Sequence, residues 1–322
     1  MSKSDPTLPG MPWHITRIIM DGTDVLSRPA IRRCSRTLRR YSDEVNAEFE
    51  RINIQFSNKY ITLVLQTKTG SQSITYQYSV SDHNIGTLIM ADDYIERLAF
   101  DLIAIVARPN VTVKELHIWK LGAGYIGELV RDREELIAKR TYTEEQFETD
   151  EAVFLKAMKK MLGEKKINLK KLDVALTEHK VEHVVKMLSF FTPTVLEDMN
   201  LELLKEPKNS KELFELDQWK QASKVSFDHR SLKVPIKKLL HFKNLMIIRR
   251  KISLKEAKIL IEGATRHGKN LGKYRFAVWG NDQEVCDYVK ELNGVVNIPD
   301  EGVTLEVLTH RSEFIIRKKR FD

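Results

Sequence analysis

The spacing of apolar residues at the start of the chain predicts short helices. Between Met11 and Val45, apolar side chains recur three and four positions apart, which is the period of a helix with one apolar face. The polar sequence Asp21-Gly22-Thr23 interrupts this pattern, and Pro29 fits the first turn of a following helix. The apolar positions form two faces, namely Ile15, Ile18 and Ile19 in the first helix and Ile31, Cys34 and Leu38 in the second.

From Phe49 onward the period changes to two, which predicts strands. Apolar and polar residues alternate in successive runs up to Val80, with turn residues between the runs. This pattern is typical of a three-stranded antiparallel meander with one solvated face. An apolar stripe between Ile95 and Val106 then predicts a helix that ends before Pro109.

The rest of the chain alternates between short strands and helices. From Leu172 the predicted strands recur about every 20–30 residues, a period typical of solenoids, in which each unit packs against its neighbours. Their polar and apolar residues alternate, whereas the strands of a doubly wound sheet are apolar throughout. We therefore predict an α/β fold that ends in a leucine-rich-repeat-like strand–helix solenoid. The expected strand cores are Val113–Trp119, Leu172–Leu176, Leu196–Leu203, Lys224–Phe227, Leu245–Ile248, Tyr274–Val278, Leu305–Leu308 and Phe314–Ile316.

Local signals place several helix ends. Ser253 with Glu256, and Thr143 with Gln146, have the spacing of a capping box, in which two side chains satisfy free backbone N–H groups. Glycines stand where a helix end favours a left-handed residue: Gly163, Gly268 and Gly294.

Length and composition indicate a globular protein of roughly two domains. The chain has 322 residues, of which 42% are hydrophobic and 30% charged. No stretch approaches the roughly 18 apolar residues that span a bilayer, and the first ten residues lack the apolar core of a signal peptide. Cys34 and Cys286 lie far apart and indicate neither a disulfide framework nor a zinc site. We therefore expect a cytoplasmic or nuclear protein that is not secreted.

The patterns divide the chain into four expected regions. Residues 1–10 are a polar lead that we expect to be disordered. Residues 11–45 form the helical region, and residues 46–110 form the meander with its helix. Residues 111–322 form the solenoid, within which 120–150 is a charged insertion of unassigned role.

Motifs for catalysis, cofactors or metals are weak in this sequence. The glycine pattern from Gly122 to Gly127 follows a predicted strand, as in dinucleotide-binding folds, but a helix start stands where the second strand and its acid should follow. His179 and His183 have a spacing that can hold a metal, yet no third ligand is marked, which favours a solvated helix face. Because nucleophile motifs are also missing, we expect no enzymatic activity, no cofactor and no metal.

A dense arginine cluster near the N-terminus has two interpretations. The chain has a net charge of +8 and a pI near 9.2, which permits contact with anionic partners. The cluster could bind phosphate or an acidic protein, or it could be a solvated face behind the second apolar stripe. Nucleic-acid binding therefore stays an alternative, although no RNA-stacking motif accompanies the cluster. Its members are Arg28, Arg32, Arg33, Arg36, Arg39 and Arg40.

The helical region resembles a divergent F-box, a helical motif that docks on the Skp-type adaptor of a cullin ubiquitin ligase. Met11-Pro12 stands for the usual Leu-Pro opening, and Ala30 to Arg39 stands for the closing helix. His14 replaces the usual acidic residue, and Asp21 to Asp24 is longer and more polar than the family's turn.

The C-terminal half, from about residue 169 to 314, resembles the FTH domain of a large nematode-expanded family of F-box proteins. The matching stretches are Lys170 to Val174, Thr192 to Glu197, Gln218-Trp219-Lys220-Gln221-Ala222, Leu240-His241-Phe242 and Ile252 to Ala257. Within them, Trp219, His241 and Phe242 are interpreted as packing residues, because large aromatic side chains dominate protein cores.

Together these resemblances imply a substrate-recognition subunit of an SCF-type ubiquitin ligase. Its F-box would bind the Skp-type adaptor and, through it, a cullin, while the solenoid would bind an unidentified target protein. A ligase-independent interaction protein is an alternative. No membrane partner is expected, because the basic helix lacks the bulky apolar face that inserts into lipid. The residues expected to bind the adaptor are Pro12, Ile15, Ile18, Ile19, Val25, Leu26, Ile31 and Leu38.

Overall fold

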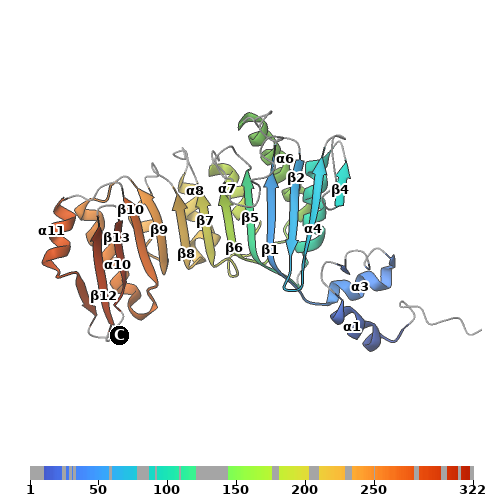
Figure 1. The fold of residues 1–322 in the computed structure, drawn as a ribbon, viewed down its shortest axis with the longest axis horizontal. Helices are drawn as coiled ribbons and strands as arrows, with labels where there is room; N and C mark the ends of the chain where they lie inside the picture. Colours follow the sequence, from blue (N-terminus) through green and yellow to red (C-terminus); the bar gives the residue numbers. More distant parts are fainter. Residues whose placement is uncertain are drawn as a thin grey trace, which may run out of the picture. The chain divides into compact units, whose positions relative to one another are not determined.

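The protein is a mixed α/β protein (Figure 1). Its chain divides into two compact units. Unit 1 comprises residues 1–170 and 190–192, and unit 2 comprises residues 171–189 and 193–322. The computed structural model describes residues 11–23, 27–28, 31, 34–57, 60–77, 87–90, 93–108, 110–120, 144–175, 181–202, 210–228, 234–249, 251–278, 283–298, 303–310 and 313–319. The expected lead (1–10), the glycine pattern (122–127) and the capping residue Thr143 lie outside this described part.

Unit 1 begins with the short helices α1 (Trp13–Gly22) and α3 (Arg36–Glu44). Pro12 precedes α1 with extended backbone angles, and Ser35 caps α3 by accepting a hydrogen bond from the Leu38 backbone N–H at 3.1 Å. A small core joins the helices and is formed by Met20, Leu38, Tyr41 and Val45, with Ile31 packed against it. Short helices are therefore present where the period predicted them, but Cys34, expected on one apolar face with Ile31 and Leu38, is exposed.

A sheet of five strands follows in unit 1, in the order β5-β1-β2-β3-β4. The β1–β2 and β2–β3 pairs are antiparallel, which confirms the predicted meander. Strand β5 pairs with β1 in parallel, and β4 pairs with β3 in parallel. The strands are β1 (Ala47–Phe56), β2 (Tyr60–Gln66), β3 (Ser71–Gln77), β4 (Thr87–Met90) and β5 (Val111–Lys120).

Two helices, α4 (Tyr94–Val106) and α6 (Glu144–Leu162), pack on this sheet. The Phe154 ring of α6 meets Phe56 of β1 edge to face at 5.9 Å. The Tyr76 hydroxyl of β3 donates a hydrogen bond to Asp101 of α4 at 3.1 Å. Burial, together with the Asp150 carboxylate, raises the pKa of Tyr94 to about 12, so this phenol stays neutral between the two helices.

Unit 2 is built on parallel strands that follow one another in chain order. Strands β6, β7, β8, β9 and β10 pair in sequence, each in parallel with the next. Then β13 pairs with β10, β12 with β13, and β11 with β12, all antiparallel. The strands are β6 (Leu169–Ala175, in unit 2 from Lys171), β7 (Asp198–Glu202), β8 (Lys224–Asp228), β9 (Asn244–Arg249), β10 (Lys273–Val278), β11 (Val295–Ile298), β12 (Val303–His310) and β13 (Glu313–Lys318).

Each strand core expected from residue 113 onward overlaps one of these strands, whereas the short strands β4 and β11 were not expected. Between the strands of unit 2 lie short helical segments. They are α7 (Val181–Leu188), α8 (Ser210–Glu215), α9 (Asp217–Gln221), η3 (Ile236–Lys238), α10 (Leu254–His267), η4 (Gly268–Asn270) and α11 (Gln283–Glu291).

One face of the sheet in unit 2 is buried and the other remains partly open. The strand register places five buried side chains in one row: Leu172, Met199, Val225, Leu245 and Tyr274. The next residues in the strands, such as Asp173 and Asn200, are only half-buried and form a hydrogen bond of 2.9 Å with each other. The alternation that argued against a doubly wound sheet is thus present in the structure.

Trp219 of α9 is at the centre of an aromatic cluster. Its ring is 1% exposed and lies 5.1 Å from Phe242, nearly perpendicular to it, and 5.3 Å from Phe214. The indole N–H donates to the Lys238 carbonyl at 3.3 Å. The His241 ring bonds the Trp219 carbonyl at 2.8 Å, and burial lowers the pKa of His241. The packing interpretation of Trp219 and Phe242 is therefore confirmed, whereas His241, interpreted in the same way, is an exposed residue whose ring lies against Phe242.

Candidate protein-docking surface

Helix α1 is attached to the rest of unit 1 through one side. Thr16 and Met20, one helical turn apart, are both fully buried. Trp13 lies against the Tyr41 ring of α3, with the ring centroids 4.5 Å apart. Arg17 and Asp21 form an exposed ion pair of 3.8 Å along the helix. These contacts leave the remaining side of α1 open to solvent.

Part of the open side of α1 is apolar, beside the exposed His14 and the Arg17–Asp21 pair. Ile15, Ile18 and Ile19, which we call the isoleucine face, are 38%, 68% and 38% exposed. Three- and four-residue spacing makes them neighbours on one helix face. With Trp13, they account for four of the six large apolar side chains that are exposed in the described part of the chain; Phe100 and Met246 are the other two. An apolar surface gathered on one short helix is typical of a site that a protein partner covers.

The other residues expected to bind an adaptor are placed differently. Pro12 is exposed beside the isoleucine face. Ile31 is half-buried against the small core. Leu38 is 3% exposed within that core, so it holds α1 and α3 together and is not available for a contact. Val25 and Leu26 lie outside the described residues.

Arg28 departs from the expected basic surface, because it is buried. Only 5% of the residue is exposed. Its Nη1 donates to the Asn46 carbonyl at 2.7 Å and its Nε donates to the Thr23 carbonyl at 3.2 Å. Arg28 therefore connects the end of α1 to the start of β1. The cluster is not one solvated face, although Arg36, Arg39 and Arg40 are exposed.

The two histidines with metal-ligand spacing were expected on a solvated helix face, and the structure differs from this expectation. His183 is 8% exposed on α7 rather than solvated, while His179 lies outside the described residues. Within the described part of the chain, no group of three or more side chains could hold a metal ion.

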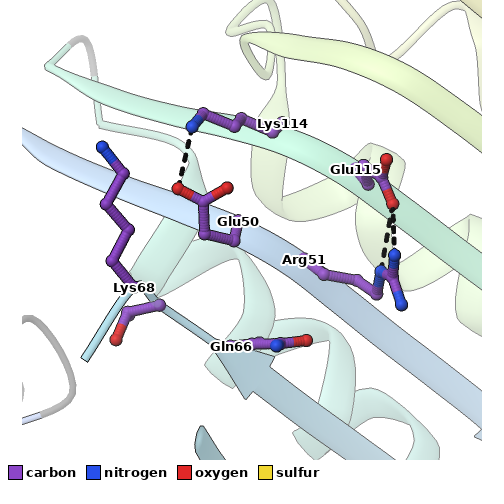
Figure 2. A pocket seen from close by; sticks show the side chains of 7 residues that line it. Glu50, Arg51, Gln66, Lys68, Lys114 and Glu115 are labelled. Carbon is purple, nitrogen blue, oxygen red and sulfur yellow. Dashed lines mark hydrogen bonds and ion pairs between the residues drawn. The ribbon is translucent and has the colours of Figure 1, made fainter. Parts of the chain in front are cut away.

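A shallow hollow on the open face of the sheet in unit 1 is lined by charged residues (Figure 2). It arises because the alternation fails in two paired strands: Glu50-Arg51 of β1 and Lys114-Glu115 of β5 are consecutive residues that all avoid the core. Lys114 bonds Glu50 at 2.8 Å, which raises the pKa of Lys114, and Arg51 bonds Glu115 at 2.9 Å. Sequence reasoning missed this irregularity, since it assumed strict alternation.

These charges satisfy one another, so the hollow does not present unpaired charge to a ligand. Its volume is about 570 Å³, and its lining contains both signs of charge. Lys68 at the rim also faces a carboxylate, Glu48, at 3.8 Å. We interpret the hollow as a salt-bridge network that covers the sheet, and the isoleucine face remains the better candidate for a functional surface.

The geometry first defines a class: a mixed α/β protein whose N-terminal helix exposes an apolar face. Comparison with known protein families then identifies one segment. Residues 152–272 match the FTH domain model. The match begins within α6, ends just before β10 and includes Trp219 and Phe242. It confirms the resemblance to the FTH domain, although residues 273–314 lie beyond it.

No curated protein and no solved structure matches the chain. Among the described residues, none of the helices combines the length and the apolar composition needed to cross a bilayer.

Proposed function

We propose that this protein is a substrate-recognition adaptor of an SCF-type ubiquitin ligase. The isoleucine face would bind a Skp-type adaptor and, through it, a cullin, and unit 2 would bind a target protein. The exposure of Ile15, Ile18 and Ile19 is the observation that carries this proposal, because a free monomer gains nothing from three solvated isoleucines on one helix. The FTH match supports it, since FTH domains are associated with F-box proteins.

The proposal includes two finer assignments of the fold. Residues 11–45 would be a divergent F-box whose helices α1 and α3 form the docking element. The parallel strands β6 to β10, which pair in chain order, would be the repeating part of a solenoid.

The proposed mechanism is positioning rather than chemistry. A protein bound at one end to the ligase and at the other to a target holds target lysines near a charged conjugating enzyme. The resulting rise in effective concentration accelerates ubiquitin transfer without any catalytic residue in this chain. The protein would act inside the cell, where the ligase is found.

Charge placed on the isoleucine face should abolish adaptor binding. Burying the exposed parts of three isoleucines contributes about 3 kcal/mol, which corresponds to roughly a hundredfold in affinity. Ile15→Glu with Ile18→Glu should therefore remove the Skp-type adaptor and the cullin from an affinity purification. Phe100→Glu is the matched control, because Phe100 is a 52% exposed side chain on a different helix of unit 1.

The folding of each variant should be checked by circular dichroism, since both changes lie on solvated surfaces. Undiminished recovery of the adaptor by the double variant would contradict the proposal. Capture of other proteins without adaptor or cullin would instead favour a ligase-independent interaction module. Salt-sensitive binding to nucleic acid that is lost on neutralising Arg36, Arg39 and Arg40 would favour the nucleic-acid alternative.

A further inference from the structure

Lysines and arginines gather where three neighbouring strands of unit 2 begin or end, on one side of the sheet. Strands β9, β10 and β13 lie side by side (Figure 1), and the register pairs Lys273 with Asn244 on one side and with Arg317 on the other. Lys318 follows Arg317 and donates its ammonium hydrogen to the Lys269 carbonyl in η4. The cations at this edge, which we call the basic edge, are Lys243, Lys269, Lys273, Arg317, Lys318 and Lys319.

Two cations of the basic edge are not neutralised by any carboxylate of the described residues. Arg317 pairs with Glu306 of β12 at 2.7 Å. In the described part of the chain, Lys243 and Lys273 have no ion-pair partner, and both are exposed. The nearby Lys224 is already paired with Asp198 at 2.6 Å and adds little to the field. Lys243 is next in sequence to Asn244, the register partner of Lys273, and an acidic ligand would lower the repulsion between such neighbouring charges.

An exposed apolar side chain stands next to the basic edge. Met246 of β9 is 40% exposed and lies two residues along the strand from Asn244, on the same open face. Its register neighbours are Ser226 and Arg275, and Arg275 is held by Glu313 of β13. Two residues of a strand span about 6.6 Å, so one extended peptide can reach Met246 and Lys273, which is level with Asn244, while Lys243 immediately precedes Asn244 at the start of β9.

We propose that the basic edge and Met246 bind an extended segment of a partner protein, rich in Asp and Glu, that carries an apolar side chain. The carboxylates would contact Lys243 and Lys273, and the apolar side chain would cover Met246. The partner's role as a ligase target rests on the proposed function above, but the binding itself does not depend on that role.

The chemistry of the surface favours a polypeptide over a nucleic acid. Single-stranded nucleic acids are held by aromatic side chains on which bases stack. Among the described residues of unit 2, Met246 is the exposed large apolar side chain, and the exposed ring of His241 is already packed on Phe242 at 3.9 Å and bonded to the Trp219 carbonyl. Met246 suits an aliphatic side chain of a peptide, because methionine adapts its shape to the group it meets.

The test uses the full chain and a labelled ten-residue peptide that alternates Glu and Asp around a central Leu. Fluorescence anisotropy should detect binding that weakens as salt is raised. Lys243→Gln with Lys273→Gln should lower the affinity about tenfold, since each exposed ion pair contributes up to about 1 kcal/mol. Lys211→Gln with Lys255→Gln is the matched control, because it removes the same charge from exposed lysines of α8 and α10.

Three outcomes would overturn this inference: absence of peptide binding, an equal loss in both double variants, or tighter binding of a single-stranded oligonucleotide at the same lysines. A Met246→Ser variant should also weaken the leucine peptide but not a peptide with Ala in its place. The Ile15→Glu/Ile18→Glu variant should bind the peptide like the unaltered protein. Failure of the adaptor experiment would therefore leave this result intact, and the reverse also holds.

Discussion

At the scale of single residues, the solvent exposure of Arg28 and of Ile18 is the opposite of what their residue types suggest. Arg28 is a charged residue with only 5% exposure, whereas Ile18 is an apolar residue with 68% exposure. The guanidinium of Arg28 donates hydrogen bonds to two backbone carbonyls, which satisfies two of its five N–H groups. Arg28 thereby stabilises the helices that present Ile18, and the exposed residue depends on the buried one.

Replacing Arg28 should loosen the helical region without altering its exposed surface. Arg28→Ala leaves the carbonyls of Thr23 and Asn46 without their donors, which should cost about 1–3 kcal/mol. Arg28→Lys should recover only part of this, because an ammonium group cannot reproduce the planar fork of the guanidinium. Hydrogen exchange of the α1 backbone amides measures this loss of stability, because a less stable helix opens more often and its amides then exchange faster. Arg39→Ala, a change at an exposed arginine of α3, should leave the exchange rates unchanged; equal rates in all variants would contradict the role of Arg28.

At the scale of elements, the ends of α10 are set by residues close in sequence. Ser253 accepts a hydrogen bond from the Glu256 N–H at 3.3 Å, and the Glu256 carboxylate accepts one from the Ser253 N–H at 3.0 Å. Gly268 then ends the helix with a φ of 48°, a left-handed conformation that a residue with a Cβ atom rarely adopts. Between these ends, α10 buries Ala257, Leu260 and Ala264.

Removing the cap should destabilise the first turn of α10. Ser253→Ala leaves one backbone N–H group without its acceptor, at a cost of about 1 kcal/mol. Amides in the first turn of α10 should exchange about fivefold faster, while those of α11 should not change. Lys255→Ala, in the same turn but outside the capping box, is the control. Identical exchange in the two variants would show that packing alone fixes the start of this helix.

The sequence predicted best the elements whose structure is determined by residues close to one another in the chain. The capping box at Ser253 and the alternation of β2 need only neighbours in sequence, and both are found in the structure. The burial of Arg28 was missed because its acceptor, the Asn46 carbonyl, lies 18 residues away. The hollow at Glu50-Arg51 was missed for a similar reason, since its matching irregularity is in β5. The grouping of Ile15, Ile18 and Ile19 on one face followed from the period of α1, and their exposure was expected only from the resemblance to an F-box. The burial of Leu38 depends on how α1 packs against α3.

At the scale of the whole molecule, the two proposed surfaces belong to different compact units. The isoleucine face lies in unit 1, and the basic edge lies in unit 2. The first is apolar, so its binding should depend little on salt. The second is cationic and exposed, so its binding should weaken as salt is raised. The physical difference between the surfaces provides a way to observe each one separately in the same full-length protein.

Because the surfaces share no residues and lie in separate units, their effects on binding should be additive. Saturating the protein with the acidic peptide should change the affinity for the Skp-type adaptor by less than about 0.5 kcal/mol, and the reverse measurement should agree by linkage. Isothermal titration with and without the second ligand measures this coupling. Combining Ile15→Glu/Ile18→Glu with Lys243→Gln/Lys273→Gln should likewise give the sum of the separate losses. A coupling well above 1 kcal/mol would show that binding at one unit is communicated to the other, and the protein would then be a switch rather than a passive connector.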